Sequence, residues 1–286
     1  MNRRDFLMSC GVAAIAAGFQ HELFASEKPR AASDRVSLGP KKISVSRLAI
    51  GTGTHGSGKS SNQIRKLGMA GVADLLRAGY DHGVTFWDTA DQYGTHSCLK
   101  DALKTVPRDK VTIVTKTEAK TAAEMRADLD RFRMELGTDY IDILLLHCMP
   151  NGTWNQERRG AMDVISEAQE KGIVRSKGTS CHTLDALKTA AAEPWVEIDL
   201  ARMNPKQVAM DGPPDVVLSV LKQMKAQGKG VMGMKVFGAG RLRDRQDEML
   251  QFHLAQNCID CFTIGMESQA ELMDNIRRIP AASVRA

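Results

Sequence analysis

Side chains suited to acid–base chemistry stand at the ends of several apolar, strand-like runs. Asp88 ends one run, and Tyr93 follows it five positions later. Lys116 and His147 end the next two runs, and Ser180 ends a fourth. A carboxylate, a phenol, an ammonium and an imidazole in one place could hold and transfer a proton. Because the carboxyl ends of barrel strands share one face, we expect the first four residues to lie together.

The runs that carry these residues recur along the chain with the spacing of βα units. Strand-like runs centre near residues 49, 86, 113, 144, 177, 200, 232 and 262. Helix-period segments separate them, for example 64–82, 122–136, 157–171 and 214–227. Glycines stand where helices should stop, at positions 83, 137, 172 and 228. Eight such units predict an α/β fold of the (β/α)8 TIM-barrel type, with a doubly wound open sheet as the alternative.

Length and composition indicate one domain, which we place at residues 31–286. The chain has 286 residues, 43% of them hydrophobic, enough for one large core. Its net charge of +5 comes without a Lys/Arg run, so no nucleic-acid partner is expected. Six cysteines do not make a disulfide scaffold at this length. We interpret the lone CxxC pair, Cys258 and Cys261, as core thiols rather than a metal site.

Residues 1–30 look like a separate signal peptide. Arg3 and Arg4 precede a mostly apolar run over residues 6–19. This run is shorter than the about 20 residues of a spanning helix, so no stable membrane insertion is expected. The segment resembles a bacterial twin-arginine signal, which implies the twin-arginine export machinery as a partner and a periplasmic location. An ordinary Sec signal or an uncleaved anchor is the alternative. A polar linker over roughly residues 26–39 is expected to lead from this segment into the first strand.

A phosphate-loop pattern opens the predicted barrel. Residues 53–60 read GTHGSGKS, which matches GxxxxGK[ST] after a strand and before a helix. In such a loop Lys59 would bind phosphates. However, the motif precedes the first βα crossover, and the best later strand for a magnesium-binding Asp ends in His147. We therefore interpret the segment as a Gly/Ser turn at the barrel rim, and a P-loop NTPase is the least favoured function.

The order of the four acid–base residues resembles the catalytic tetrad of the aldo/keto reductase family. Asp88, Tyr93, Lys116 and His147 keep the family order, and the resemblance runs from about residue 45 to 276. Similar pieces include LGTDYID at 136–142 and GMKVFGAG at 233–240. The resemblance implies a TIM barrel that reduces an aldehyde or ketone to an alcohol with NAD(P)H, usually NADPH.

Physical chemistry supports those roles. Hydride addition to a carbonyl leaves an alkoxide that needs a proton, but a free tyrosine has a pKa of about 10 and is a poorly matched acid at neutral pH. We expect Lys116 to lower the pKa of Tyr93, and Asp88 to keep Lys116 charged and in place. Neutral His147 would orient the substrate oxygen.

The resemblance also implies a nucleotide site over the later strands. Ser180 would hold the nicotinamide carboxamide, with Cys181 in place of the usual asparagine. Met234 replaces a stacking aromatic residue, and Lys235 would pair with the pyrophosphate. The other implied cofactor-binding residues are Gly51, Thr52, Asp88, Phe237, Gly238, Gly265, Ser268 and Asn275. Glu271 should repel a 2′-phosphate, so NAD(H) stays possible beside NADP(H). No metal ligands are implied.

The expected substrate is a small polar or sugar-like carbonyl compound. Gln92, Glu118 and Cys148 occupy places where many family members carry aromatic residues, and the chain ends soon after Asn275. Both features predict an open, polar pocket. The alternative function is a nicotinamide-binding regulatory protein built on the same barrel.

Overall fold

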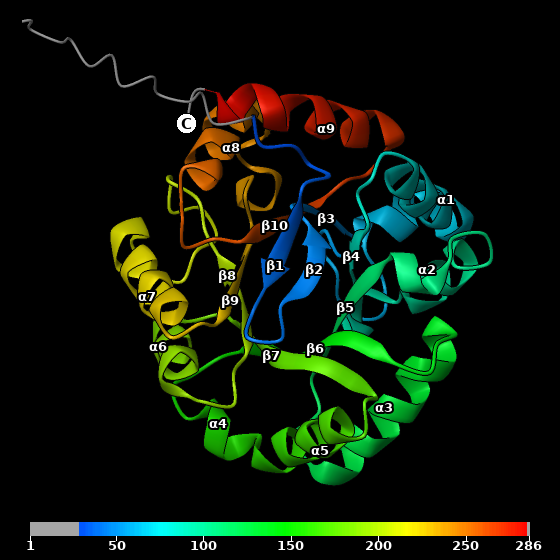
Figure 1. The fold of residues 1–286 in the computed structure, drawn as a ribbon, viewed down its shortest axis with the longest axis vertical. Helices are drawn as coiled ribbons and strands as arrows, with labels where there is room; N and C mark the ends of the chain where they lie inside the picture. Colours follow the sequence, from blue (N-terminus) through cyan, green and yellow to red (C-terminus); the bar gives the residue numbers. More distant parts are fainter. Residues whose placement is uncertain (1–28, 285–286) are drawn as a thin grey trace, which may run out of the picture.

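The computed structural model describes residues 29–284, and within them eight parallel strands close into a barrel (Figure 1). Their order around the barrel is β10-β3-β4-β5-β6-β7-β8-β9. The strands are β3 Leu48–Gly51, β4 Phe86–Asp88, β5 Thr112–Thr117, β6 Ile141–Met149, β7 Val174–Cys181, β8 Ile198–Arg202, β9 Gly230–Met234 and β10 Cys261–Gly265. The predicted (β/α)8 fold and all eight predicted strand positions are confirmed.

Helices form a ring around this barrel (Figure 1). They are α1 Asn62–Asp81, α2 His96–Ala102, α3 Ala122–Leu136, α4 Trp154–Glu157, α5 Arg159–Glu170, α6 Leu184–Ala192, α7 Pro214–Ala226, α8 Gln246–Leu254 and α9 Gln269–Ser283. Short 3-10 turns are η1 Asp91–Tyr93, η2 Arg108–Lys110, η3 Gly238–Gly240 and η4 Arg243–Arg245. The helix α3 shows the expected signals, because Thr121 and Glu124 form a capping box and Gly137 ends it at φ +66°.

A hairpin closes the amino end of the barrel, where a polar linker over residues 26–39 was predicted. Its strands, β1 Arg35–Leu38 and β2 Ile43–Ser46, pair in antiparallel register and lie across the centre of the ring in Figure 1. Leu38, Ile43 and Val45 are buried in the same cluster as barrel-interior residues such as Phe86 and Val114. The linker prediction was therefore wrong from residue 35 onward.

Other predictions concern thiols and membranes. Cys258 and Cys261 are buried and free, which confirms that they are core thiols. Among the helices described, none combines the length and apolar character needed to cross a bilayer. The twin-arginine segment falls on residues 1–28, which lie outside the described residues, so that signal stays a prediction.

Candidate active site

The four predicted acid–base residues meet at the carboxyl end of the barrel. Asp88 ends β4, Lys116 and His147 lie in β5 and β6, and Tyr93 is the last residue of η1. Lys116 Nζ forms an ion pair with Asp88 Oδ1 and donates to the Thr89 carbonyl at 2.8 Å. It lies 4.9 Å from the centre of the Tyr93 ring. The Tyr93 hydroxyl lies 3.4 Å from His147 Nε2. The structure thus brings all four together.

Burial makes the charge pairing in this group obligatory. Asp88 is 4% exposed and Lys116 is 1% exposed, and an unpaired buried charge is strongly destabilising. The second Asp88 oxygen, Oδ2, accepts from Thr263 Oγ1 at 2.8 Å. Burial pushes the pKa of Lys116 down, but the charges of Asp88 and Tyr93 outweigh it and the pKa is raised. Lys116 therefore stays a cation fixed by Asp88.

The proton affinities of Tyr93 and His147 are set chiefly by burial. Burial raises the pKa of Tyr93 to about 12, against the opposing charge of Lys116. The predicted influence of Lys116 is present, but the net lowering of the Tyr93 pKa was wrong because desolvation is the larger effect. Burial, then the charge of Lys116, lowers the pKa of His147 well below 6.5. At neutral pH the site holds a protonated phenol and a neutral imidazole.

The GTHGSGKS loop packs directly against the Tyr93 ring. A Cβ added at Gly53 or Gly56 would overlap the ring carbons of Tyr93, so both positions need glycine for close approach. Lys59 pairs through Nζ with Asp91, and its backbone N–H donates to the Gln92 carbonyl at 2.9 Å. The segment is the rim turn expected from the sequence, and its lysine already has a carboxylate partner.

An open cleft runs from this group across the barrel mouth to Arg243. Six of the implied cofactor-binding residues line it: Gly51, Asp88, Met234, Lys235, Phe237 and Gly265. Other lining residues, which the sequence reasoning missed as part of the site, are Gly53, Thr54, His55, Leu200, Val236, Ala239, Gly240, Arg243, Thr263 and Ile264. The cleft therefore adjoins the acid–base group and carries half or more of the residues implied for the cofactor.

The remaining implied cofactor-binding residues do not line the cleft. Thr52 donates to the Asp88 carbonyl at 2.9 Å, and Ser180 Oγ accepts from the Cys148 N–H at 2.9 Å. Gly238 begins η3, and Ser268 caps α9. Asn275 is 2% exposed and lies on α9. In this structure none of these five residues lies on the wall of the cleft.

Two features of the described residues fit an anionic nucleotide. Lys235 lines the cleft with no carboxylate within ion-pair distance among residues 29–284, at a left-handed φ of +58°. Burial, then Arg202, lowers its pKa. Such an unpaired, strained cation is typical of a ligand site. Asn275 Oδ1 is buried without a partner among the same residues, so it can accept a hydrogen bond from a ligand.

At the far end of the cleft, opposite charges are already paired. Arg243 contacts Glu271 Oε1 at 3.1 Å and Glu267 Oε1 at 3.5 Å. The Glu271 carboxylate, expected to repel a 2′-phosphate, therefore has a cation beside it. Arg243 could have been noticed from the sequence as a basic residue soon after the glycines of 238–240, but its pairing joins η4 to α9 and follows from no local pattern.

Near the tetrad the neighbouring side chains are polar. Gln92 Nε2 donates to Glu118 Oε2 at 2.7 Å. Cys148 Sγ lies 3.3 Å from His182 Nε2, and Cys148 has a left-handed φ of +59°. No aromatic wall is formed by these positions. None of the four residues lines the main cleft, so the open, polar pocket stays a prediction.

Comparison with known proteins agrees with this fold. The model of the aldo/keto reductase family matches residues 47–281, and the chain belongs to this family, whose members use NADP(H). It is 24% identical over 228 residues to D-threo-aldose 1-dehydrogenase of Pseudomonas sp, covering 68% of each chain. It is 36% identical over 140 residues to 2,5-diketo-D-gluconic acid reductase B of Corynebacterium sp. (strain SHS752001), covering 45% of this chain and 47% of that one.

Among solved structures, similarity extends over most of the barrel. An aldo/keto reductase of Klebsiella pneumoniae in complex with NADP and acetate matches with a TM-score of 0.67 at 20% identity, covering 86% of this chain and 89% of that one. This likeness shows the shared fold. The chain spans about two thirds of the length of the Pseudomonas relative and about half of the Corynebacterium relative.

Proposed function

We propose that this protein is an NAD(P)H-dependent oxidoreductase that reduces an aldehyde or ketone to an alcohol, with Tyr93 as the proton donor. One observation carries the proposal. The Tyr93 hydroxyl, 3.4 Å from His147 Nε2 and close to Lys116, adjoins a cleft whose cation Lys235 has no carboxylate partner among residues 29–284. This combination places a proton donor, an orienting imidazole and a cation for a nucleotide phosphate next to one cleft.

Each residue has a separate task in the proposed reaction. The hydride for the carbonyl carbon would come from a reduced nicotinamide held in the cleft beside Lys235. A substrate oxygen within hydrogen-bond distance of Tyr93 and His147 is oriented by the neutral imidazole and receives the phenolic proton. Lys116 then stabilises the phenolate, and Asp88 keeps Lys116 charged and fixed. Lys235 would pair with the pyrophosphate, and Asn275 Oδ1 would accept at the adenosine end.

For the substrate we infer a small polar or sugar-like carbonyl compound. The Gln92–Glu118 and Cys148–His182 pairs place polar groups beside the tetrad, where a polyhydroxy compound can be hydrogen-bonded. Two relatives are named for sugar or sugar-acid substrates. NADPH is the favoured cofactor, with NADH possible because Glu271 stands at the far end of the cleft. A substrate panel in which bulky apolar ketones turn over best would contradict this class.

We further propose export through the twin-arginine system to the periplasm. The proposal rests on Arg3, Arg4 and the apolar run at residues 6–19. That system carries folded proteins, so the nucleotide would be bound before export. Mass spectrometry of protein recovered from the periplasm should find it without the signal and with nucleotide bound. Full-length protein confined to the cytoplasm would contradict the proposal.

The function is tested by mixing the purified protein with NADPH or NADH and a panel of carbonyl compounds. We expect quenching of nicotinamide fluorescence together with carbonyl-dependent oxidation of the nucleotide. Tyr93→Phe should abolish reduction and keep the quenching, because the phenyl ring fills the same space without the hydroxyl. Quenching without turnover in the unaltered protein would instead support a regulatory nicotinamide-binding protein. ATP hydrolysis that is lost in Lys59→Ala would support an NTPase.

A further inference from the structure

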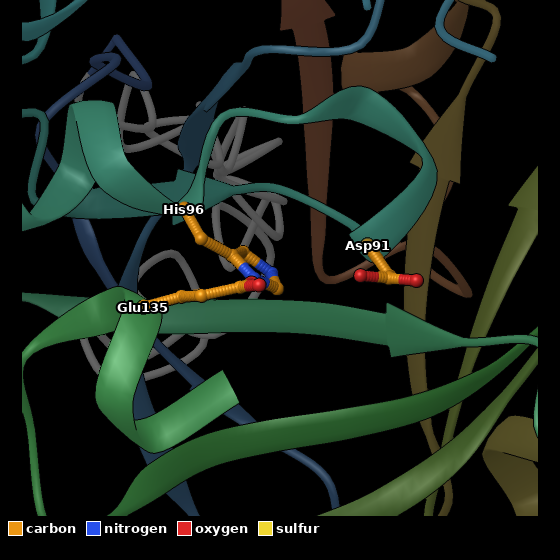
Figure 2. Close-up of side chains that lie close together, drawn as sticks. All are labelled: Asp91, His96 and Glu135. Carbon is orange, nitrogen blue, oxygen red and sulfur yellow. The ribbon is translucent and has the colours of Figure 1, made fainter. Parts of the chain in front are cut away.

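A chain of polar side chains outside the cleft joins the turn that carries Tyr93 to the strand that carries Lys116. Its members come from η1, α2, α3 and β5, elements that are separate in the sequence. Figure 2 shows three of them, with His96 and Glu135 meeting and the Asp91 carboxylate beside them. In order, the contacts run from Asp91 through Arg131, Glu135 and His96 to Thr115.

The first end of the chain fixes the turn of Tyr93. Asp91 begins η1, a single turn that has no side-chain hydrogen bond at its amino end. Arg131 Nη1 donates to Asp91 Oδ1 at 2.5 Å, and Lys59 pairs with the same oxygen. Tyr93 lies two residues further on, so the carboxylate of Asp91 is the tie between this short turn and helix α3.

The second end reaches the strand of Lys116. Glu135 Oε2 lies 2.7 Å from His96 Nδ1, and His96 Nε2 lies 2.7 Å from Thr115 Oγ1. Thr115 immediately precedes Lys116 in β5 and points to the opposite side of the strand. Thr115 is fully buried and His96 is 3% exposed, so the contact between these two side chains is shielded from water.

Arg131 is the cation that joins the two halves. The same Nη1 that donates to Asp91 lies 3.1 Å from Glu135 Oε1, while Nη2 donates to Asp128 Oδ1 at 2.5 Å. Asp91, His96 and Glu135 could by their atom types hold a metal ion. The guanidinium already lies between the two carboxylates, however, and both nitrogens of His96 have partners. The group therefore contains its own cation.

We propose that Arg131 is a positioning residue for proton transfer, setting the place of Tyr93 relative to Lys116 from outside the cleft. This inference rests on the proposed reductase function. Arg131 touches neither the cleft nor the tetrad. A planar guanidinium binds several carboxylate oxygens in fixed directions, which a flexible ammonium cannot reproduce. Because the proton must pass over a short distance, a displacement of about 1 Å in the Tyr93 turn can lower turnover roughly 100-fold.

The experiment compares Arg131→Met, Arg131→Lys and the matched control Arg126→Met. Arg126 lies on the same helix but is an exposed partner of Glu167. For each protein we would measure kcat and KM for the best carbonyl compound, the Kd for NADPH by fluorescence quenching, and the Tm. Arg131→Met should lower kcat roughly 10- to 100-fold while KM and Kd change by less than about twofold. Arg131→Lys should recover part of kcat, and Arg126→Met should match the unaltered protein.

Asp91→Asn provides a second variant in case Arg131→Met does not fold. It removes the negative charge at η1 and leaves the Arg131 contacts to Asp128 and Glu135, and we expect a fall in kcat of roughly 10-fold. Folded variants with a lowered Tm but an unchanged kcat would overturn the positioning role and leave Arg131 as a structural residue. If none of the carbonyl compounds tested makes the unaltered protein oxidise NADPH, the proposed function itself fails, which is a separate result.

Discussion

The ammonium of Lys116 lies 4.9 Å from the centre of the Tyr93 ring, while its charge is paired with Asp88. This relationship is what allows Tyr93, in the proposed reaction, to stay protonated at neutral pH and still donate its proton to a substrate oxygen. Burial keeps the phenol protonated, with a pKa of about 12. In the reaction proposed above, the nearby cation would stabilise the phenolate formed when an alkoxide takes the proton. The pairing with Asp88 prevents Lys116 from losing its own charge in a buried site.

The pH profile of carbonyl reduction should be flat around neutrality. Reduction needs Tyr93 protonated, and its raised pKa keeps it so until the pH approaches about 12. Reduction also needs His147 neutral, and its pKa lies well below 6.5, so the acid limb should appear well below that value. Measurement of kcat/KM from about pH 5 to about pH 10 checks both. A fall centred near neutral pH would contradict these assignments.

Gly53→Ala should impair turnover by displacing the Tyr93 ring. The added methyl group would overlap ring carbons of Tyr93, so the ring must move. We expect kcat to fall roughly 10- to 100-fold, with the Kd for NADPH changed by a smaller factor. Gly58→Ala in the same loop is the control. Its Cβ meets no atom within 4 Å, and its φ of +57° implies a small loss of stability only. Equal kcat values for the two variants would argue against a role for the close contact between Gly53 and the Tyr93 ring.

Asp199→Asn should remove a pH dependence of stability. Asp199 is fully buried, its Oδ2 has no partner among the described residues, and burial raises its pKa to about 8. Between about pH 4 and about pH 8 the unfolded chain has lost this proton while the folded protein keeps it. Folding stability from this group therefore falls as the pH rises through that window.

Urea denaturation at about pH 5 and about pH 8 measures the effect. Asp199→Asn should raise the free energy of unfolding more at about pH 8 than at about pH 5, with a difference on the order of 4 kcal/mol, because each pH unit in this window is worth about 1.4 kcal/mol. Asp163→Asn, at an exposed position on α5, should change neither value. An Asp199→Asn variant with the same pH dependence as the unaltered protein would disprove the assignment.

Chelation should leave turnover unchanged. The Asp91, His96 and Glu135 group has the atom types of a metal site, but Arg131 lies between its carboxylates. Dialysis against EDTA followed by a carbonyl-reduction assay checks this. Activity that is lost on dialysis and restored by Zn²⁺ would show that an ion displaces the guanidinium.

Much of the barrel could be predicted because its signals are local. Buried parallel strands are continuous apolar runs, and helices end at glycines such as Gly137. The hairpin was missed because β1 and β2 have four residues each and carry polar residues such as Ser37 and Ser44 between apolar ones. Such short strands look like a linker until the barrel floor on which Leu38 packs is known.

The grouping of the site residues could be predicted from the sequence, but the pKa of Tyr93 could not. Residue types and spacing indicated that Asp88, Tyr93, Lys116 and His147 would meet. The net rise in the pKa of Tyr93 could not be predicted, since it depends on how closely the loop of Gly53 covers the ring. Arg131 was missed for a similar reason, because its contacts join elements that are distant in the chain.

The hairpin at the amino end covers one end of the packed barrel interior. Leu38, Ile43 and Val45 pack against interior residues such as Phe86 and Val114, so the amino end is covered and the cleft lies at the opposite end. Removing β1 and β2 would let water enter beneath Phe86 and hydrate the space under Asp88 and Lys116. The ion pair would then weaken in a more polar medium, although every tetrad residue would still be in the chain.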